Sequence, residues 1–238
     1  MILTRARACV PHIHENVRRP DCLGSVEMGV PELIGRHSRQ PRGLVGRIIT
    51  RMMARKTSAS IPWTVGLLGL EPNHRVVEVG FGQGDSLAAL LNSVPSGHVA
   101  GVELSATMVA AAAKRFKEPL GRGQLSLYHT EDGALPVPDT SFDRAVTLNT
   151  IYITADPTAL FGELFRVLVP EGKAAITFPE RQRFAEFPPA QTEGFFLHKL
   201  SDLEAAMAKV GFSDVAVHSN PELPLAPMCL VGVRPQLS

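Results

Sequence analysis

The chain has 238 residues, of which 45% are hydrophobic and 20% are charged. These values are ordinary for a globular protein with a large core, and they argue against disorder over most of the chain. Its three cysteines, Cys9, Cys22 and Cys229, are too few for a disulfide framework, so we expect a reducing, cytoplasmic setting. The apolar uncharged stretches are shorter than the roughly 20 residues that a bilayer requires, so we expect no membrane span.

The charge is divided unevenly along the chain. The net charge is +1, but residues 1–56 contain 11 Lys+Arg and 4 Asp+Glu, which gives +7, and residues 57–238 contain 13 and 19, which gives −6. The split indicates a basic N-terminal arm or a basic cap over an acidic body. Because the arginines are dispersed without interleaved aromatic residues, we expect no specific binding of nucleic acid.

The first part of the chain has little periodicity. We predict a loosely structured basic extension over 1–41, followed by N-terminal cap helices within 42–70 and a single catalytic domain over 71–238. Apolar residues recur at three- and four-residue spacing over 43–56, which is typical of an amphipathic helix, and a second helix is expected over 62–68.

Two cysteines and two histidines of the extension are zinc-ligand candidates by residue type. Cys9, His12, His14 and Cys22 match no standard spacing of a structural zinc site, so we expect no metal.

From residue 71 onward, short β-branched runs alternate with helical patterns. The expected strands and helices are strands 74–80, 98–104, 124–129, 142–149, 173–178, 213–219 and 228–234, and helices 84–94, 106–117, 157–169 and 201–210. This alternation predicts an α/β fold with a Rossmann-like, doubly wound, seven-stranded and mostly parallel sheet. Only a turn separates the last two strands, so they should form an antiparallel hairpin at one edge.

The strongest functional signal is a glycine-rich turn directly after the first strand. Gly80, Gly82 and Gly84 have the spacing G-x-G-x-G, in which bare backbone and a helix N-terminus can face a ligand. A dinucleotide site has G-x-G-x-x-G, and here Asp85 occupies the position of its third glycine. Together with Glu78, this acid would repel a pyrophosphate and suit a cationic amino group. The alternative of an NAD(P)-dependent oxidoreductase is therefore disfavoured.

A second acidic residue follows the next strand. Glu103 lies 19 residues beyond Gly84, close to the distance at which a carboxylate reaches a ribose hydroxyl. It could also simply flank the start of the following helix.

Four segments now reveal a family resemblance: VVEVGFGQG (76–84), GVELS (101–105), TEDGALPVPDTSFD (130–143) and ELFRVLVPEGKAAI (163–176). In order and spacing, the chain resembles class I S-adenosylmethionine-dependent methyltransferases. The nearest group is the small-molecule type (methyltransferase type 11), which includes the ubiquinone and menaquinone methyltransferases. The resemblance implies S-adenosylmethionine as cofactor.

The resemblance also implies a set of cofactor-binding residues. They are Glu78, Gly80, Phe81, Gly82, Gly84, Glu103, Leu104, Glu131, Asp132, Gly133 and Asn149. In the family, the first acid helps to hold the amino group of the methionine moiety, and the acid after the second strand binds the ribose. Either Glu131 or Asp132 is expected beside the adenine, and Asn149 beside the methyl group.

The acceptor site is less clearly marked. Methyl transfer needs alignment above all, and a general base only if the acceptor must lose a proton. Tyr152, His129 and His198 are the catalytic candidates, with Glu193 as a further possible base, and each has ordinary packing as its alternative. The Phe-rich segment 179–199 could form a lid.

The cap helices could add an apolar surface over the mouth of the site. Met52, Met53 and Trp63 would provide it, unless they simply pack on the domain edge. We therefore predict methyl transfer to a small, partly apolar acceptor by in-line displacement. A catalytically silent S-adenosylmethionine-binding interaction module is the other alternative, and the oligomeric state, a homodimer included, stays open.

Overall fold

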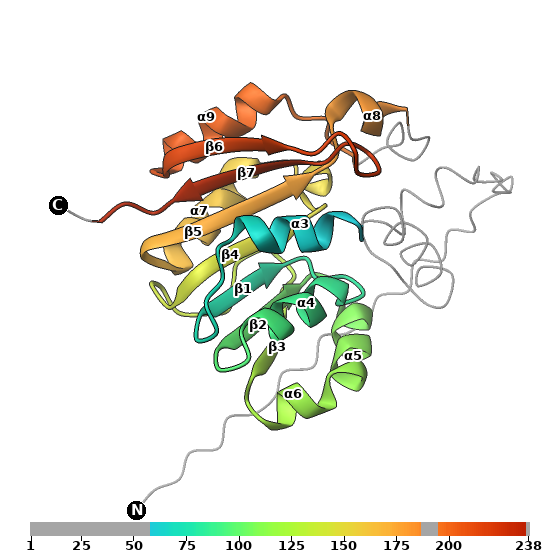
Figure 1. Ribbon diagram of the computed structural model, residues 1–238, viewed down its shortest axis with the longest axis vertical. Coiled ribbons are helices and arrows are strands. Elements are labelled where there is room, and N and C mark those ends of the chain that lie inside the picture. The colour runs from blue at the N-terminus through green and yellow to red at the C-terminus, as the bar shows by residue number, and fades with distance from the viewer. Residues whose placement is uncertain (1–57, 187–194, 237–238) are drawn as a thin grey trace, which may run out of the picture.

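A computed structural model describes residues 58–186 and 195–236 of the chain (Figure 1). The predicted extension 1–41 and the predicted helix 43–56, with Met52 and Met53, lie outside these residues. The described part is built on a seven-stranded sheet with the order β3-β2-β1-β4-β5-β7-β6. The strands are β1 (Arg75–Val79), β2 (His98–Glu103), β3 (Leu125–His129), β4 (Phe142–Leu148), β5 (Leu168–Phe178), β6 (Ser213–Ser219) and β7 (Met228–Val233).

The direction of the strands places their ends where a site can form. Strands β1 to β5 pair in parallel, and β7 runs antiparallel to both β5 and β6. The arrowheads of β1, β4 and β5 accordingly point to the same edge (Figure 1). Strand order reverses between β1 and β4, where the two halves of a doubly wound sheet leave a crevice. The predicted sheet and its C-terminal hairpin are confirmed.

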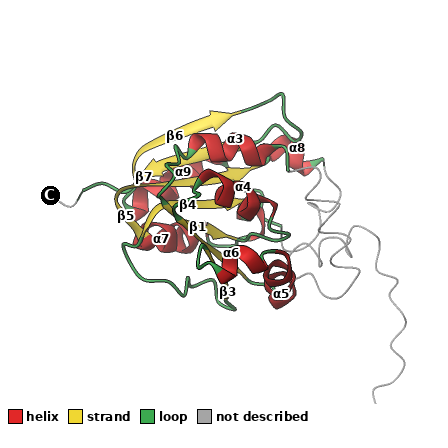
Figure 2. Ribbon diagram, turned by 60° about the horizontal axis from the view of Figure 1, so that its bottom comes forward, coloured by secondary structure: helices red, strands yellow, loops and turns green. Residues whose placement is uncertain are grey.

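Helices cover both faces of the sheet (Figure 2). They are α3 (Ser60–Leu67), α4 (Asp85–Ser93), α5 (Ala106–Arg115), α6 (Lys117–Gly121), η1 (Ile151–Ile153, a 3₁₀ turn), α7 (Pro157–Val167), α8 (Arg181–Ala185) and α9 (Leu200–Val210). None of the helices in the described ranges is long and apolar enough to cross a membrane.

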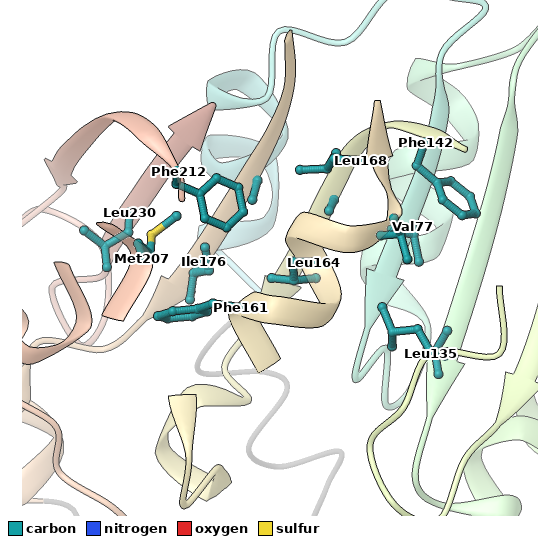
Figure 3. Close-up of a cluster of buried hydrophobic side chains, with 14 of the residues drawn as sticks. Val77, Leu135, Phe142, Phe161, Leu164, Leu168, Ile176, Met207, Phe212 and Leu230 are labelled. Carbon is teal, nitrogen blue, oxygen red and sulfur yellow. The ribbon is translucent and has the colours of Figure 1, made fainter. Parts of the chain in front are cut away.

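Each face of the sheet carries its own apolar core. On one face, residues of α7 and α9 such as Phe161, Leu164 and Met207 pack against Val77 and Ile176 of the sheet (Figure 3). On the other face, α3, α4 and α5 cover a second cluster that includes Leu68, Leu90 and Ala112. Strands that are buried on both faces have nearly continuous apolar sequences, which explains why short β-branched runs located them well.

The structure departs from the predicted elements in a few places. Strand β5 begins at Leu168, five residues earlier than predicted, because the turn at Glu171 and Gly172 stays within the strand. There the backbone of Arg234 accepts from Glu171 N and donates to Gly172 O. The short elements α6, η1 and α8 were not predicted, since three to five residues carry no periodic signal.

Candidate active site

A cavity of about 730 Å³ opens at the carboxyl ends of β1, β2, β3 and β4. Its wall includes the glycine turn after β1, the loop after β3, the segment after β4 and the first turns of α7. This volume is typical of a pocket that holds a small molecule or cofactor. Nine of the eleven predicted cofactor residues line it: Gly80, Phe81, Gly82, Glu103, Leu104, Glu131, Asp132, Gly133 and Asn149.

The glycine turn is held in a shape that only glycine adopts easily. Gly80 has φ of 78°, and a Cβ built on it would lie 2.1 Å from Cγ2 of Thr150. Gly84 has φ of 80° and caps helix α4, where a Cβ would meet the Phe116 ring at 2.8 Å. Gly84 therefore shapes the turn and does not itself line the cavity.

The carboxylate of Glu103 ties the end of β2 to the glycine turn. Its Oε2 accepts from Gly82 N at 2.9 Å, and its Oε1 accepts from Ser105 N at 3.0 Å. Burial raises the pKa of Glu103, while these backbone hydrogen bonds act in the opposite direction. The adjacent Leu104 is 43% exposed although it lines the cavity, so it offers an apolar surface to a flat ring.

Glu78 lies beneath the turn rather than on the cavity wall. It is 1% exposed, its carboxyl group is hydrogen bonded by Ser86, and its Oε2 has no hydrogen-bond partner among the described residues. Burial raises the pKa of Glu78 to about 8, with a further contribution in the same direction from nearby Glu103. A buried acceptor without a partner is costly, and a nearby cation would offset that cost.

Two other acidic side chains on the cavity wall form ion pairs or hydrogen bonds within the protein. Asp85 pairs with Arg115, with 2.7 Å between Oδ1 and Nη1, so it is not the free acid that we had expected opposite a cationic ligand. Asp132 accepts from Thr130 Oγ1 and Ala134 N, and the Ala134 backbone bond is the main cause of its lowered pKa. Both Glu131 and Asp132 line the cavity, so the choice between them as the adenine contact stays open.

Asn149 follows β4 in a left-handed conformation with φ of 60°, which asparagine tolerates better than most residues. Its backbone N–H donates to Thr177 O at 2.8 Å, so the hydrogen bonding between β4 and β5 continues one residue beyond the end of β4. Asn149 and the next residue, Thr150, both line the cavity.

Tyr152 lines the far end of the cavity and is only 8% exposed. Its ring packs on those of Phe184 and Phe195, with centroid distances of 4.4 and 5.7 Å. Burial raises the pKa of Tyr152, so its phenol stays protonated near neutral pH. Tyr152 can therefore contact an acceptor or donate a hydrogen bond, but it is a poor general base.

Two of the predicted catalytic side chains are not on the cavity wall. Nε2 of His129 lies 3.1 Å from Leu104 O, and Nε2 of His198 lies 2.9 Å from Thr154 O. Because a carbonyl oxygen only accepts, each of these nitrogens must carry the proton. Neither nitrogen can then serve as a proton acceptor in this arrangement.

The predicted lid and cap are only partly described. Glu193 falls outside the described residues. The described parts of segment 179–199 pack against Tyr152 of η1 and do not line the cavity. Phe196 N donates to Tyr152 O at 2.7 Å, which ties this segment to η1. Trp63 packs against the core under α3, whereas Ile61 of the same helix reaches the cavity.

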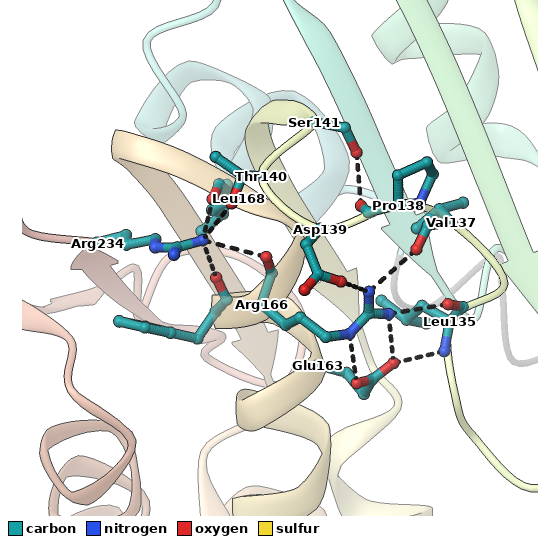
Figure 4. Close-up of polar contacts among 11 residues, drawn as sticks. Leu135, Val137, Pro138, Asp139, Thr140, Ser141, Glu163, Arg166, Leu168 and Arg234 are labelled. Carbon is teal, nitrogen blue, oxygen red and sulfur yellow. Dashed lines mark hydrogen bonds and ion pairs between the residues drawn. The ribbon is translucent and has the colours of Figure 1, made fainter.

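Arg166 fixes the loop that joins β3 to β4 (Figure 4). Its guanidinium contacts both oxygens of Glu163 at 2.8 Å and donates to Leu135 O and Val137 O. It also pairs with Asp139. Glu163 lines the cavity and accepts from Leu135 N at 2.6 Å, and bonding to Arg166 is the main reason for its lowered pKa.

Several lining residues had not been singled out in the sequence. Within the described ranges the cavity is also lined by Thr150, Thr154, Asp156, Leu160, Glu163 and Met108. Proximity to Asn149 could have indicated Thr150, and Glu163 begins the segment 163–176 of the family resemblance, but no motif includes Asp156 or Leu160. In the same part of the chain, no group of three or more His, Cys, Asp or Glu side chains could hold a metal ion.

Comparison with known proteins supplies the family. The model of the family described as "Methyltransferase domain" matches residues 76–172, which run from β1 to the first half of β5 and include the glycine turn. These residues form a methyltransferase domain, and the comparisons support S-adenosylmethionine-dependent methyl transfer as its activity. The alternative of an oxidoreductase has no support from these comparisons.

Individual relatives agree with this family. The methyltransferase is 29% identical over 184 residues to the uncharacterized methyltransferase YdaC of Bacillus subtilis, covering 77% of this chain and 96% of that protein. It is 29% identical to demethylmenaquinone methyltransferase of Thermus thermophilus, covering 52% of this chain and about half (51%) of that protein. A structure of a SAM-dependent methyltransferase from Aquifex aeolicus has the same fold, with a TM-score of 0.62, 20% identity and coverage of 76% and 91%.

The residues present fit S-adenosylmethionine. The glycine turn leaves no room for a side chain at Gly80 or Gly84, Glu103 lies at the end of β2, and the unpartnered Oε2 of Glu78 lies beneath the turn. A phosphate-free cation suits this acidic surrounding better than a dinucleotide does.

Proposed function

We propose that the methyltransferase acts on a small, partly apolar acceptor that binds between η1 and the first turns of α7. The observation that carries this proposal is the continuity of the cavity from the glycine turn to Tyr152, Ile153 and Leu160. Donor and acceptor can therefore share one cavity, which is the arrangement an in-line displacement requires.

The cofactor half of the cavity is the part lined by the glycine turn, Glu103 and Leu104, and each of these groups has a role in binding. Gly80 and Gly82 present backbone to the methionine moiety, Glu103 takes the ribose hydroxyls, and Leu104 packs against the adenine. Glu78 offers its unpartnered Oε2 from beneath the turn, and a bound cation would favour the ionised form of this carboxyl group. Bound S-adenosylmethionine supplies an activated methyl group on a sulfonium.

The acceptor half of the cavity is the part between η1 and the first turns of α7. It serves mainly to position the methyl acceptor and to exclude water. Ile61, Ile153 and Leu160 give it apolar walls, and Tyr152 adds a polar tip on an aromatic support. Because His129 and His198 lie off the cavity wall and the phenol of Tyr152 stays protonated near neutral pH, we favour an acceptor atom that reacts without a strong general base. Two relatives are methyltransferases named for small substrates, demethylmenaquinone and phosphoethanolamine.

Transfer of labelled methyl from S-adenosylmethionine to a panel of phenols, amines and quinol-like compounds tests this proposal. We expect transfer to at least one apolar member, and a changed preference among panel members in Tyr152→Phe, which loses the hydroxyl but keeps the ring stack. Calorimetry should show that S-adenosylmethionine binds equally well to both proteins. Tight binding without transfer to any member would favour the catalytically silent module, and binding of NADH in its place would contradict the cofactor assignment.

A further inference from the structure

Thr150 has a side chain that is fixed at both of its branches. Its methyl carbon Cγ2 lies directly over Gly80, where a Cβ on the glycine would approach it to 2.1 Å. Its hydroxyl is hydrogen bonded to the hydroxyl of Thr147 on β4. Both Thr150 and Gly80 line the cavity, so this side chain is held against the part of the glycine turn that faces the ligand.

The hydroxyl protons of this pair can be assigned from their partners. Thr147 Oγ1 donates to Val79 O at 2.9 Å, because a carbonyl oxygen can only accept. A hydroxyl has one proton, so the bond between the two threonines must use the proton of Thr150. The chain of bonds runs from Thr150 through Thr147 to the end of β1. The remaining lone pairs of Thr150 Oγ1 can therefore only accept.

This acceptor lies where positive charge is expected. Gly80 directly follows β1, and the second-to-last residue of this strand is the buried Glu78, one of whose carboxyl oxygens lacks a partner among the described residues. A hydrogen-bond acceptor fixed by its neighbours requires little reorganisation when a cation binds, which makes such a bond strong.

We propose that Thr150 is a cofactor-binding residue whose hydroxyl oxygen, held as an acceptor by Thr147, receives an N–H from the α-ammonium group of S-adenosylmethionine. The residue thus acts on the methionine end of the cofactor. Its role does not depend on the identity of the methyl acceptor.

The test uses ligand binding and needs no acceptor. Thr150→Val keeps the branched shape over Gly80 and removes only the oxygen. Calorimetry should show that it weakens both S-adenosylmethionine and S-adenosylhomocysteine by roughly 10-fold or more, as expected for loss of a charged hydrogen bond. Binding of neutral methylthioadenosine, which lacks the amino acid portion, should change less than about twofold. Thr150→Ser, which keeps the oxygen, should stay close to the wild type.

A cycle that pairs this mutation with a change in the ligand gives a second measurement. The deaminated analogue of S-adenosylhomocysteine should bind the wild type and Thr150→Val about equally, because the proposed bond is then absent from both complexes. Thr150→Ala serves in the same cycle if Thr150→Val does not fold, as judged by its melting temperature. Thr107→Val on α5, which makes the same chemical change away from the cavity wall, is the control and should leave every affinity unchanged.

Unchanged affinity for S-adenosylhomocysteine in Thr150→Val would overturn the proposal. So would an equal loss for S-adenosylhomocysteine and its deaminated analogue, since that result would mean a purely steric role. Loss of S-adenosylmethionine binding alone would move the contact from the ammonium to the methylsulfonium and would likewise overturn it. Failure of the wild type to bind any of these ligands would contradict the cofactor assignment instead.

Discussion

The two halves of the cavity are built in different ways. In the cofactor half, the decisive groups are backbone amides and glycines at the ends of β1 and β2, and Glu103 links these two strand ends through Gly82 N. In the acceptor half, η1 is supported by the rings of Phe184 and Phe195 and by the bond from Phe196 N to Tyr152 O. The first half is fixed by backbone conformation at the ends of neighbouring strands, and the second by packing of aromatic side chains from segments far apart in the chain.

This difference suggests how the two halves can change. A glycine turn leaves few alternatives, because a side chain at Gly80 would meet Thr150 and would also have to adopt a left-handed conformation. An apolar wall tolerates exchange of one hydrophobic side chain for another of similar volume. Acceptor choice can therefore vary while the cofactor site stays the same, and mutations should separate the two.

The largest expected effect is on stability, from the acceptor half. Phe184→Ala removes a buried ring that stacks 4.4 Å from Tyr152, so it should lower the free energy of unfolding by about 3 kcal/mol. If the halves are independent, the Kd for S-adenosylmethionine should stay within about twofold while methyl transfer falls. Denaturant unfolding and calorimetry measure the two quantities, and a parallel loss of cofactor affinity would show that the halves are coupled.

Next in size is a mutation in the glycine turn. Gly80→Ala adds a Cβ that would lie 2.1 Å from Thr150 Cγ2 on a backbone with φ of 78°, so the turn must move. Because a non-glycine residue is strained in this conformation and the contact with Thr150 must also be relieved, we expect the affinity for S-adenosylmethionine to fall by roughly 100-fold. Gly121→Ala in α6 is the matched control, since a Cβ there meets nothing within 4 Å. Near-normal binding by Gly80→Ala would show that the turn is adaptable.

Glu103→Ala should have a somewhat smaller effect. It removes the acceptor of the Gly82 and Ser105 amides together with the proposed ribose contact, so we expect a roughly 10- to 30-fold rise in the Kd for S-adenosylmethionine. Glu103→Gln keeps one oxygen and should lose less. Equal affinities of the alanine variant and the wild type in a calorimetric titration would refute the ribose assignment.

The smallest effect concerns pH. Because the pKa of Glu78 is raised to about 8 from 4.5, the folded protein binds more protons here than the unfolded chain between these values. Its contribution to stability therefore falls as the pH rises through this range. Between pH 6 and 7 the free energy of unfolding of the wild type should fall by about 1 kcal/mol more than that of Glu78→Gln, whose side chain does not titrate. Identical pH profiles of urea unfolding would show that Glu78 has an ordinary pKa.

The same contrast explains what the sequence could predict. The strands were found from their β-branched runs, and Gly80, Gly82 and Glu103 from fixed spacing along a continuous stretch. The support of Tyr152 by Phe184 and Phe195 depends on residues more than 30 positions away in the chain, for which a single sequence carries no periodic signal. His129 and His198 were chosen by residue type, whereas their bonds to backbone carbonyls depend on the tertiary structure.

The position of β7 has a consequence for the order in which the chain is synthesised. Strands β1 to β4, whose ends surround the cavity, are complete once residue 148 has left the ribosome. Strand β7 is the last of the seven in chain order, yet it lies between β5 and β6. Until residues 228–233 emerge, β5 keeps a bare edge and β6 has no neighbour in the sheet. A nascent chain stalled in this interval exposes an unpaired strand edge, the kind of surface on which chains aggregate and chaperones act.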